Sequence, residues 1–184
     1  MSGKYLQTSS AVPDCSKAVA SSSASDGVYV IRPGLSDDRR TARTYCQRDS
    51  AGGPGWTVIQ RRLDGRQSFS RGWDDYAAGF GDADGDYWLG NEYIHRLTSL
   101  RPFRLRVDMW DVDGRHWVAE YPAFRVASSD ELYRLDLGRP RTDEHANAPG
   151  NHSRLHRPTT FRLLLLIYSF QFRSAFPPRC RDGF

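Results

Sequence analysis

The sequence predicts an α+β domain built mainly from antiparallel strands with a few short helices. Two segments, 56–62 and 103–110, alternate bulky β-forming residues with polar ones, which is the period of a half-buried strand. Turn signals such as Asp64-Gly65 and Asp113-Gly114 separate the predicted strands at short intervals. With 184 residues, of which 39% are hydrophobic, the chain is long enough for one domain with a core of its own.

The first predicted strand is 27–31, Gly-Val-Tyr-Val-Ile, and the segment 44–46 can pair with it. Cys15 precedes this pair of strands and Cys46 lies within it. A disulfide between these two cysteines is one possibility, and it would leave Cys180 over. Such a bridge would contribute about 3 to 4 kcal/mol to the free energy of unfolding in a protein that matures in an oxidising compartment.

Two short helices are predicted in the middle of the chain. In 73–80 the aromatic residues are spaced by three and four, so they fall on one helical face. A second helix is predicted over 93–100, because apolar residues cover one side of it and Pro102 prevents its continuation. Four further strands are expected after Pro102, at 103–110, 117–121, 124–126 and 131–137.

The distribution of charge argues against a nucleic-acid-binding protein. The formal net charge is +4, but residues 1–138 carry 18 basic against 19 acidic residues and net −1. Residues 139–184 carry 8 basic against 3 acidic residues, so the excess positive charge lies in this Pro-, Arg- and His-rich tail. The main body therefore lacks the basic surface that a phosphate binder needs.

Neither a signal peptide nor a membrane span is evident in the sequence. Residues 1–12 are polar and lack the apolar centre of a secretion signal. The apolar run 161–170 contains an arginine and is about half as long as a membrane-spanning helix. The segment 1–13 shows neither heptads nor Gly-X-Y triplets, so the sequence does not indicate an oligomeric state.

Asp82, Asp84 and Asp86 alternate in a glycine-containing loop, as calcium ligands often do. An EF-hand loop starting at Asp82 needs glycine at its sixth position, which is Tyr87 here, and it has no glutamate at the twelfth. Asp111 and Asp113 belong to an ordinary hairpin turn. We therefore expect solvated turns and no metal at these aspartates.

An enzyme is not predicted. The residues that could form an acid–base set, as in glycosidases, are Asp108, Asp111, His116 and Glu120. We expect strand alternation to scatter them over both faces of a sheet. The sequence also lacks the Gly-x-Ser-x-Gly, His-Glu-x-x-His and phosphate-loop motifs. No catalytic residue is therefore assigned.

The tail contains residue types that bind zinc, but prolines interrupt it. These residues are His145, His152, His156 and Cys180. Pro149-Gly150 and Pro158 flank the closest histidine pair and argue against an ordered helix, so we expect no metal site. Asn151 begins a glycosylation sequon that matters only in a secreted chain. The five tryptophans are expected to serve core packing for the most part, with sugar or base stacking as the alternative.

A series of motifs in a single order is more specific than any one of them. It comprises Asp14-Cys15, Gly27-Val-Tyr29, Tyr45-Cys46, Gly55-Trp-Thr-Val-Ile-Gln-Arg-Arg62, Asp64-Gly65, Phe69, Arg71, Trp73, Tyr76, Gly79-Phe-Gly81, Tyr87-Trp-Leu-Gly-Asn-Glu92, Ile94-His95, Leu97-Thr98, Leu105-Arg-Val-Asp108, Ala119-Glu-Tyr121, Tyr133-Arg-Leu135 and Gly138. This series resembles the fibrinogen C-terminal domain family, which includes ficolins, tachylectins, angiopoietins and tenascins.

The resemblance implies a secreted, non-catalytic domain that binds acetylated carbohydrate, a receptor or a matrix protein, in adhesion or innate immunity. It implies a disulfide between Cys15 and Cys46 that ties down a small N-terminal subdomain. A central subdomain is expected to contain a twisted antiparallel sheet with short helices, followed by a loop-rich C-terminal subdomain. Residues 1–12 would be an extension and 13–138 a partial domain.

The resemblance ends after Gly138. The family's Asp-x-Asp calcium loop and second cysteine pair have no counterpart in 139–184. We therefore expect a domain truncated before its ligand and calcium sites, with no cofactor, and with an unrelated tail. The alternative is a short regulatory isoform or a mispredicted gene product that binds no ligand.

Overall fold

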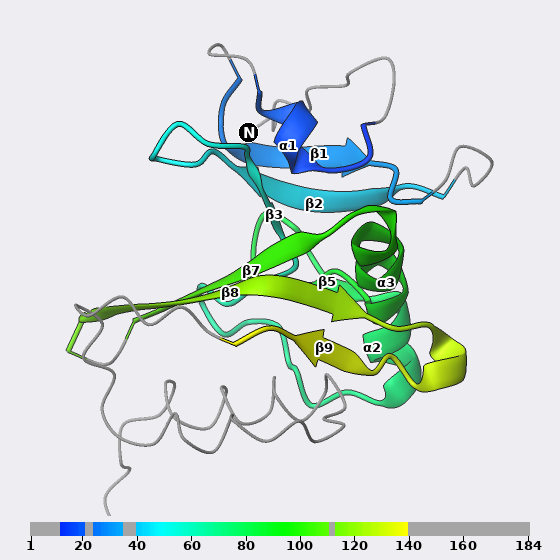
Figure 1. Cartoon of the computed structure of the whole chain (residues 1–184). Helices are drawn as coiled ribbons and strands as arrows, with labels where there is room; N and C mark the ends of the chain where they lie inside the picture. The colour runs from blue at the N-terminus through cyan, green and yellow to red at the C-terminus, as the bar shows by residue number, and fades with distance from the viewer. Residues whose placement is uncertain (1–11, 21–23, 35–39, 111–112, 140–184) are drawn as a thin grey trace, which may run out of the picture. The chain divides into compact units, whose positions relative to one another are not determined.

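The computed structural model describes residues 12–20, 24–34, 40–110 and 113–139. The chain forms two compact units, Met1–Arg101 and Pro102–Phe184. Within the described ranges, the secondary structure consists of antiparallel sheets and a few short helices (Figure 1). The predicted α+β class is confirmed. The tail residues Cys180, Asn151 and the three histidines lie outside the described ranges.

The first unit begins with a small antiparallel sheet in the order β1-β2-β3. Its strands are β1 (Gly27–Ile31), β2 (Ala42–Gln47) and β3 (Trp56–Val58). Alternate residues of β2 are buried, as the period of a strand requires. Val12, the last residue of the expected extension, forms a parallel bridge with Ile31.

A disulfide joins Cys15 to Cys46 and fixes the short helix α1 (Cys15–Ala18) to this sheet. The two Cα atoms are 5.3 Å apart, and both cysteines are fully buried. The backbone N–H of Cys15 also donates to the Thr57 hydroxyl at 3.1 Å. The predicted bridge and the disulfide-tied N-terminal part of the domain are therefore confirmed.

The N-terminus of α1 is held by the buried carboxylate of Asp14. Its Oδ1 accepts from the backbone N–H of Ser16 at 2.8 Å, and its Oδ2 accepts from Arg101 at 2.9 Å. Burial by itself raises the pKa of Asp14. The hydrogen bonds from Ser16 and Arg101 and the charge of Arg101 outweigh this effect, so the pKa lies below its usual value.

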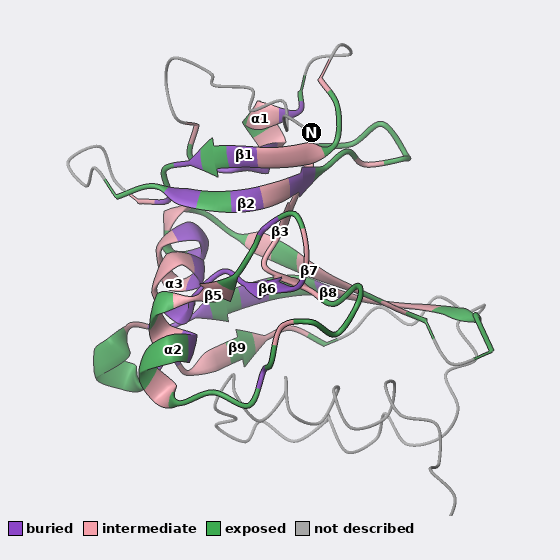
Figure 2. Cartoon of the chain, turned by 180° about the vertical axis from the view of Figure 1, so that it is seen from behind, coloured by how far each residue is buried: buried purple, intermediate pink, exposed green. Residues whose placement is uncertain are grey.

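A second sheet in the first unit has the order β4-β6-β5, with strands β4 (Gln60–Arg61), β6 (Tyr87–Trp88) and β5 (Phe80–Gly81). The helices α2 (Trp73–Ala78) and α3 (Asn91–Leu100) lie beside it, and the buried residues of α3 fall on one face (Figure 2). An aromatic cluster forms the core here. Tyr76 contacts Phe80 at 5.1 Å and Trp88 at 5.9 Å between ring centroids.

The prediction of one continuous strand over 56–62 is wrong, because this segment forms two separate strands, β3 and β4. The chain leaves the first sheet after β3 and enters the second at β4, so one alternating run serves two sheets. Ile59 lies between them, and its carbonyl accepts from the N–H of Leu89 at 2.9 Å. The predicted helix 73–80 also ends earlier, because Phe80 belongs to β5.

The second unit contains a sheet in the order β7-β8-β9. Its strands are β7 (Phe103–Trp110), β8 (His116–Val126) and β9 (Leu135–Leu137), and β7 and β8 form the long hairpin in Figure 1. The two strands predicted at 117–121 and 124–126 are one strand. Pro122 lies near an irregularity in the register with β7, where a missing N–H is tolerated.

The start of the last strand was predicted wrongly. The short 3-10 helix η1 (Ser129–Glu131) precedes β9, and Leu132 and Tyr133 adopt positive φ angles of 56° and 50°. A turn closed by the hydrogen bond from Tyr133 N–H to the Ser128 carbonyl, 2.9 Å, makes this conformation. In the part of the chain that the structure describes, the strands form three small antiparallel sheets, in agreement with the predicted antiparallel architecture.

Candidate functional site

One face of the β7–β8 hairpin gathers charged and aromatic side chains. The register pairs Arg106 with Glu120 and Trp110 with His116, and Asp108 lies between these pairs on β7. Residues that are directly opposite in an antiparallel pair share a face, as do alternate residues of one strand. We call this set of five residues the Trp110 face.

Ion pairs connect the polar members of the Trp110 face. Arg106 donates to both carboxylate oxygens of Asp108, at 2.8 and 3.0 Å, and to Glu120 at 3.4 Å. His116 Nε2 lies 2.8 Å from the Oδ1 atom of Asp108. The expectation that Asp108, His116 and Glu120 are scattered over both faces is therefore wrong. Asp111 lies outside the described residues.

Trp110 is the exposed aromatic residue of this face. Its ring stacks on the His116 imidazole with 4.4 Å between centroids and an interplanar angle of 14°. Trp110 is 59% exposed, whereas Trp88 is 2% exposed and serves the core as predicted. Sequence reasoning missed the exposure of Trp110. The available signal was its place at the end of an alternating run, just before a turn.

The carboxylate of Asp108 is held ionised. Partial burial by itself raises the pKa of this group, but the hydrogen bonds and charge of Arg106, together with the contact with His116, lower it below its usual value. Asp108 therefore accepts hydrogen bonds and is poorly suited to donate a proton near neutral pH. Arg106 bridges both carboxylates, so the charged side chains of this face are held in place by one another.

The alternating aspartates of the 82–86 loop do not converge. Asp86 is buried, and its Oδ1 accepts from the backbone N–H groups of Leu63 and Asp64. Asp82 instead accepts from the backbone of Asp84 at 3.2 Å, within its own turn. In the part of the chain that the structure describes, no three His, Cys, Asp or Glu side chains gather to hold a metal.

Asp86 therefore has a structural role, which gives a first prediction. Its pKa is lowered because backbone N–H groups, including that of Leu63, outweigh the effect of burial. Replacing Asp86 by alanine is expected to lower the free energy of unfolding by about 1 to 3 kcal/mol, since the Leu63 and Asp64 N–H groups lose their acceptor. Urea denaturation measures this difference. Asp84→Ala, at an exposed position of the same loop, is the control and should change stability by less than about 0.5 kcal/mol.

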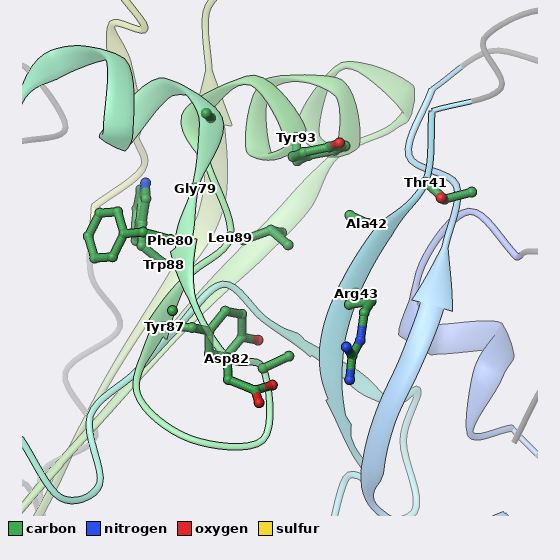
Figure 3. Close-up of a pocket in the computed structure, with 13 residues that line it drawn as sticks. Thr41, Ala42, Arg43, Gly79, Phe80, Asp82, Tyr87, Trp88, Leu89 and Tyr93 are labelled. Atoms are coloured by element: carbon green, nitrogen blue, oxygen red, sulfur yellow. The ribbon is translucent and has the colours of Figure 1, made fainter. Parts of the chain in front are cut away.

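A shallow pocket of about 290 Å³ lies in the first unit, lined by β2, β5, β6 and the helices α2 and α3. Figure 3 shows Thr41 and Arg43 on one wall and Tyr93, Leu89 and Asp82 across from them. Its volume is at the lower end of the range for small-molecule sites.

Two buried residues that line this pocket, Tyr87 and Trp88, use their polar atoms to hold the fold. The Tyr87 hydroxyl lies 3.2 Å from that of Thr44, accepts from the Tyr45 N–H at 3.1 Å and donates to the Val58 carbonyl. Trp88 Nε1 donates to the Tyr76 carbonyl at 2.9 Å. Burial raises the pKa of Tyr87, which keeps the phenol neutral. Because the polar atoms of Tyr87 and Trp88 serve the fold, we take the Trp110 face as the stronger candidate site.

The model of the family described as fibrinogen beta and gamma chains, C-terminal globular domain, matches residues 11–161. The chain belongs to this family. The match continues past Gly138 into the segment that the sequence analysis assigned to an unrelated tail. The boundary at Gly138 itself stays a prediction.

Among curated relatives of this fibrinogen-related domain, mouse angiopoietin-related protein 2 is 43% identical over 136 residues, covering 73% of the chain and 26% of the relative. Human angiopoietin-4 is 40% identical over 124 residues, covering 67% and 24%. The scabrous protein of Drosophila melanogaster is 41% identical over 124 residues, covering 67% and 14%. The chain thus spans about a quarter of the angiopoietin relatives.

Solved structures agree with this assignment. The fibrinogen-like globe domain of human ANGPTL2 matches with a TM-score of 0.66 at 41% identity, covering 72% of the chain and 60% of that domain. Lamprey fibrin D-dimer matches with a TM-score of 0.63 at 29% identity, covering 79% and 50%. These structural matches agree with membership of the fibrinogen C-terminal domain family. No helix in its described part is long and apolar enough to span a membrane.

Proposed function

We propose that this chain is a non-catalytic, extracellular recognition module that binds a protein or peptide ligand through the Trp110 face. The observation that carries this proposal is the 59% exposure of Trp110, stacked on His116 beside an ion-paired row of charged side chains. Tryptophan and arginine are the residue types that contribute most to protein interfaces. The charged side chains of this row already hold one another in place through ion pairs. Binding would therefore cost little additional side-chain conformational entropy.

Two further observations support an extracellular protein ligand. The buried Cys15–Cys46 disulfide suits an oxidising compartment, as for secreted proteins. The lamprey fibrin structure that matches this fold holds the peptide Gly-His-Arg-Pro-amide, which is a ligand of that protein. Binding to acetylated carbohydrate stays an alternative ligand class. We propose that binding needs neither calcium nor another cofactor, and no catalytic step.

The test is saturable binding to cell surfaces. The full chain, expressed behind a secretion leader in animal cells and purified, is labelled and titrated onto cultured cells. We expect binding that saturates, is displaced by excess unlabelled chain and is unchanged by EDTA. Loss of binding in EDTA would instead indicate a metal-dependent site.

The competing hypothesis is a regulatory or mispredicted chain that binds nothing. It predicts only non-saturable background on every cell type tested. That result with folded, disulfide-bonded protein would contradict the proposed function. Displacement by N-acetylglucosamine, but not by cell-surface protein fragments, would replace the protein ligand by a carbohydrate.

A further inference from the structure

We propose that the Trp110 face binds its ligand more weakly in mild acid, because the Nδ1 atom of His116 takes up a proton. This inference rests on the proposed function, and it names how the same site is regulated. It is drawn from three observations: the hydrogen bond that fixes the imidazole, the exposure of the imidazole beside Trp110, and the balance of charge along the hairpin.

The hydrogen bond to Asp108 determines which nitrogen of His116 takes up a proton. The Nε2 atom lies 2.8 Å from Oδ1 of Asp108, and Arg106 holds this carboxylate ionised. An ionised carboxylate can only accept, so the hydrogen of the neutral imidazole lies on Nε2 and Nδ1 is the basic nitrogen. Histidine is the side chain whose charge ordinarily changes between about pH 5 and 8. Mild acid therefore adds a proton at Nδ1.

The protonated Nδ1 depends on water as its hydrogen-bond partner. Among the described residues, the hydrogen bond from Nε2 is the one that His116 makes, and its side chain is 41% exposed. A ligand that covers Trp110 and the stacked imidazole would remove this water. Covering a charged N–H group without an acceptor costs more free energy than covering a neutral ring nitrogen. Binding is therefore expected to weaken when His116 is charged.

The balance of charge along the hairpin favours the same direction. Four charged residues share this side of β7 and β8 with His116, by strand alternation and register: Arg104, Arg106, Asp108 and Glu120. Two cations and two anions make this row neutral as long as His116 is neutral. A proton on His116 adds one positive charge that the row does not compensate. A ligand that covers the row would then exclude water from an uncompensated charge.

His116 is the group of this face whose charge changes in mild acid. Carboxylates ordinarily titrate below the range of histidine, and guanidinium groups titrate above it. The adjoining turn holds Asp113 and Arg115 as an ion pair, 3.5 Å apart, so this pair adds no net charge next to His116. Strand β9 pairs with Phe124–Val126, at the other end of β8 from His116, so its charged residues are remote.

Binding of the labelled full chain to cells, titrated at about pH 7.4 and at about pH 5.5, tests this inference. We expect the affinity of the wild type to fall by about two- to fivefold in acid, as for one partly exposed charge. In His116→Gln the amide can still donate to Asp108, but it gains no charge. The loss of affinity in acid should therefore disappear in this variant.

His95→Gln is the matched control for the loss of a histidine. His95 lies on α3 in the first unit and is not part of the Trp110 face. This variant should bind as the wild type does at both pH values, with the same loss of affinity in acid.

A second measurement follows His116 without any ligand. In the full chain with nitrogen-15-labelled tryptophan, the Trp110 indole signal is the one that disappears in Trp110→Phe. Because the two rings are stacked with 4.4 Å between centroids, we expect this signal to shift through one transition between about pH 8 and 5. The transition should be absent in His116→Gln. The signal of Trp88, which is 2% exposed, should stay in place and report that the fold persists in acid.

The outcomes separate this inference from the proposed function. Saturable binding with equal affinity at both pH values in the wild type would overturn the inference and leave the proposed function in place. Equal weakening of the wild type and His116→Gln in acid would also overturn it, since another group would then titrate. A Trp110 signal that does not move with pH would contradict proton uptake beside the ring. If no cell type is bound at either pH, the proposed function fails, and its regulation fails with it.

Discussion

The double substitution Cys15→Ala/Cys46→Ala is expected to lower the free energy of unfolding by about 3 to 4 kcal/mol. The bridge closes a loop with a sequence separation of 31 residues, so its loss increases the conformational freedom of the unfolded chain. It also removes the covalent link between α1 and β2, whose cysteines are both fully buried. Equilibrium denaturation in guanidinium chloride, monitored by tryptophan fluorescence, measures the change.

Cys180→Ser is the matched control, because Cys180 is the one cysteine of the sequence that the Cys15–Cys46 bridge does not use. It should leave the midpoint of denaturation within error of the wild type. A double variant as stable as the wild type would show that the bridge adds nothing to the fold. Equal destabilisation by both changes would point instead to a general effect of thiol loss.

The substitution Gly90→Ala is expected to destabilise the chain by about 3 to 5 kcal/mol, or to prevent folding. Gly90 has a φ of 107°, which residues with a side chain rarely adopt. A Cβ atom at this position would lie 2.7 Å from the carbonyl oxygen of Ala78. The backbone segments around Gly79 and Gly90 approach each other closely on both sides. A Cβ at Gly79 would likewise lie 2.5 Å from the Leu89 carbonyl oxygen.

Two control variants separate the contributions of conformation and close packing. Gly65 has a φ of 71° but open space around it, so Gly65→Ala should cost only the conformational part, about 1 to 2 kcal/mol. Gly27→Ala meets nothing within 4 Å and has no positive φ, so it should be nearly neutral. Thermal and chemical denaturation compare the three. If Gly90→Ala lowers the free energy of unfolding by no more than Gly65→Ala does, the segments around Gly79 and Gly90 can move apart to accept a side chain.

Local patterns predicted several elements closely. The strand at 27–31 was predicted with its observed bounds, because β-branched and aromatic residues alternate there between turn signals. The strand 103–110 was predicted correctly for the same reason. Helix α3 begins at Asn91, two residues before the predicted start, and ends at Leu100 as Pro102 required. In each case the short-range preference and the tertiary environment agree.

Other elements depended on long-range contacts. The run 56–62 alternates throughout, yet its two halves pair with β2 and β6, which are distant in sequence. Alternation of apolar and polar residues indicates that a segment is extended, but it does not predict which strand each part will pair with. Likewise, 131–137 alternates, but a turn with two positive φ angles occupies its first part.

The candidate site shows the same division. The sequence by itself determined the family, the identity of the paired cysteines and the charged and aromatic residues available on 103–120, because these follow from residue types in fixed order. Only the tertiary structure decided that Asp108, His116 and Glu120 share one face with an exposed Trp110, since this depends on the register between two strands. A shift of the register by one residue would have moved every side chain of one strand to the opposite face.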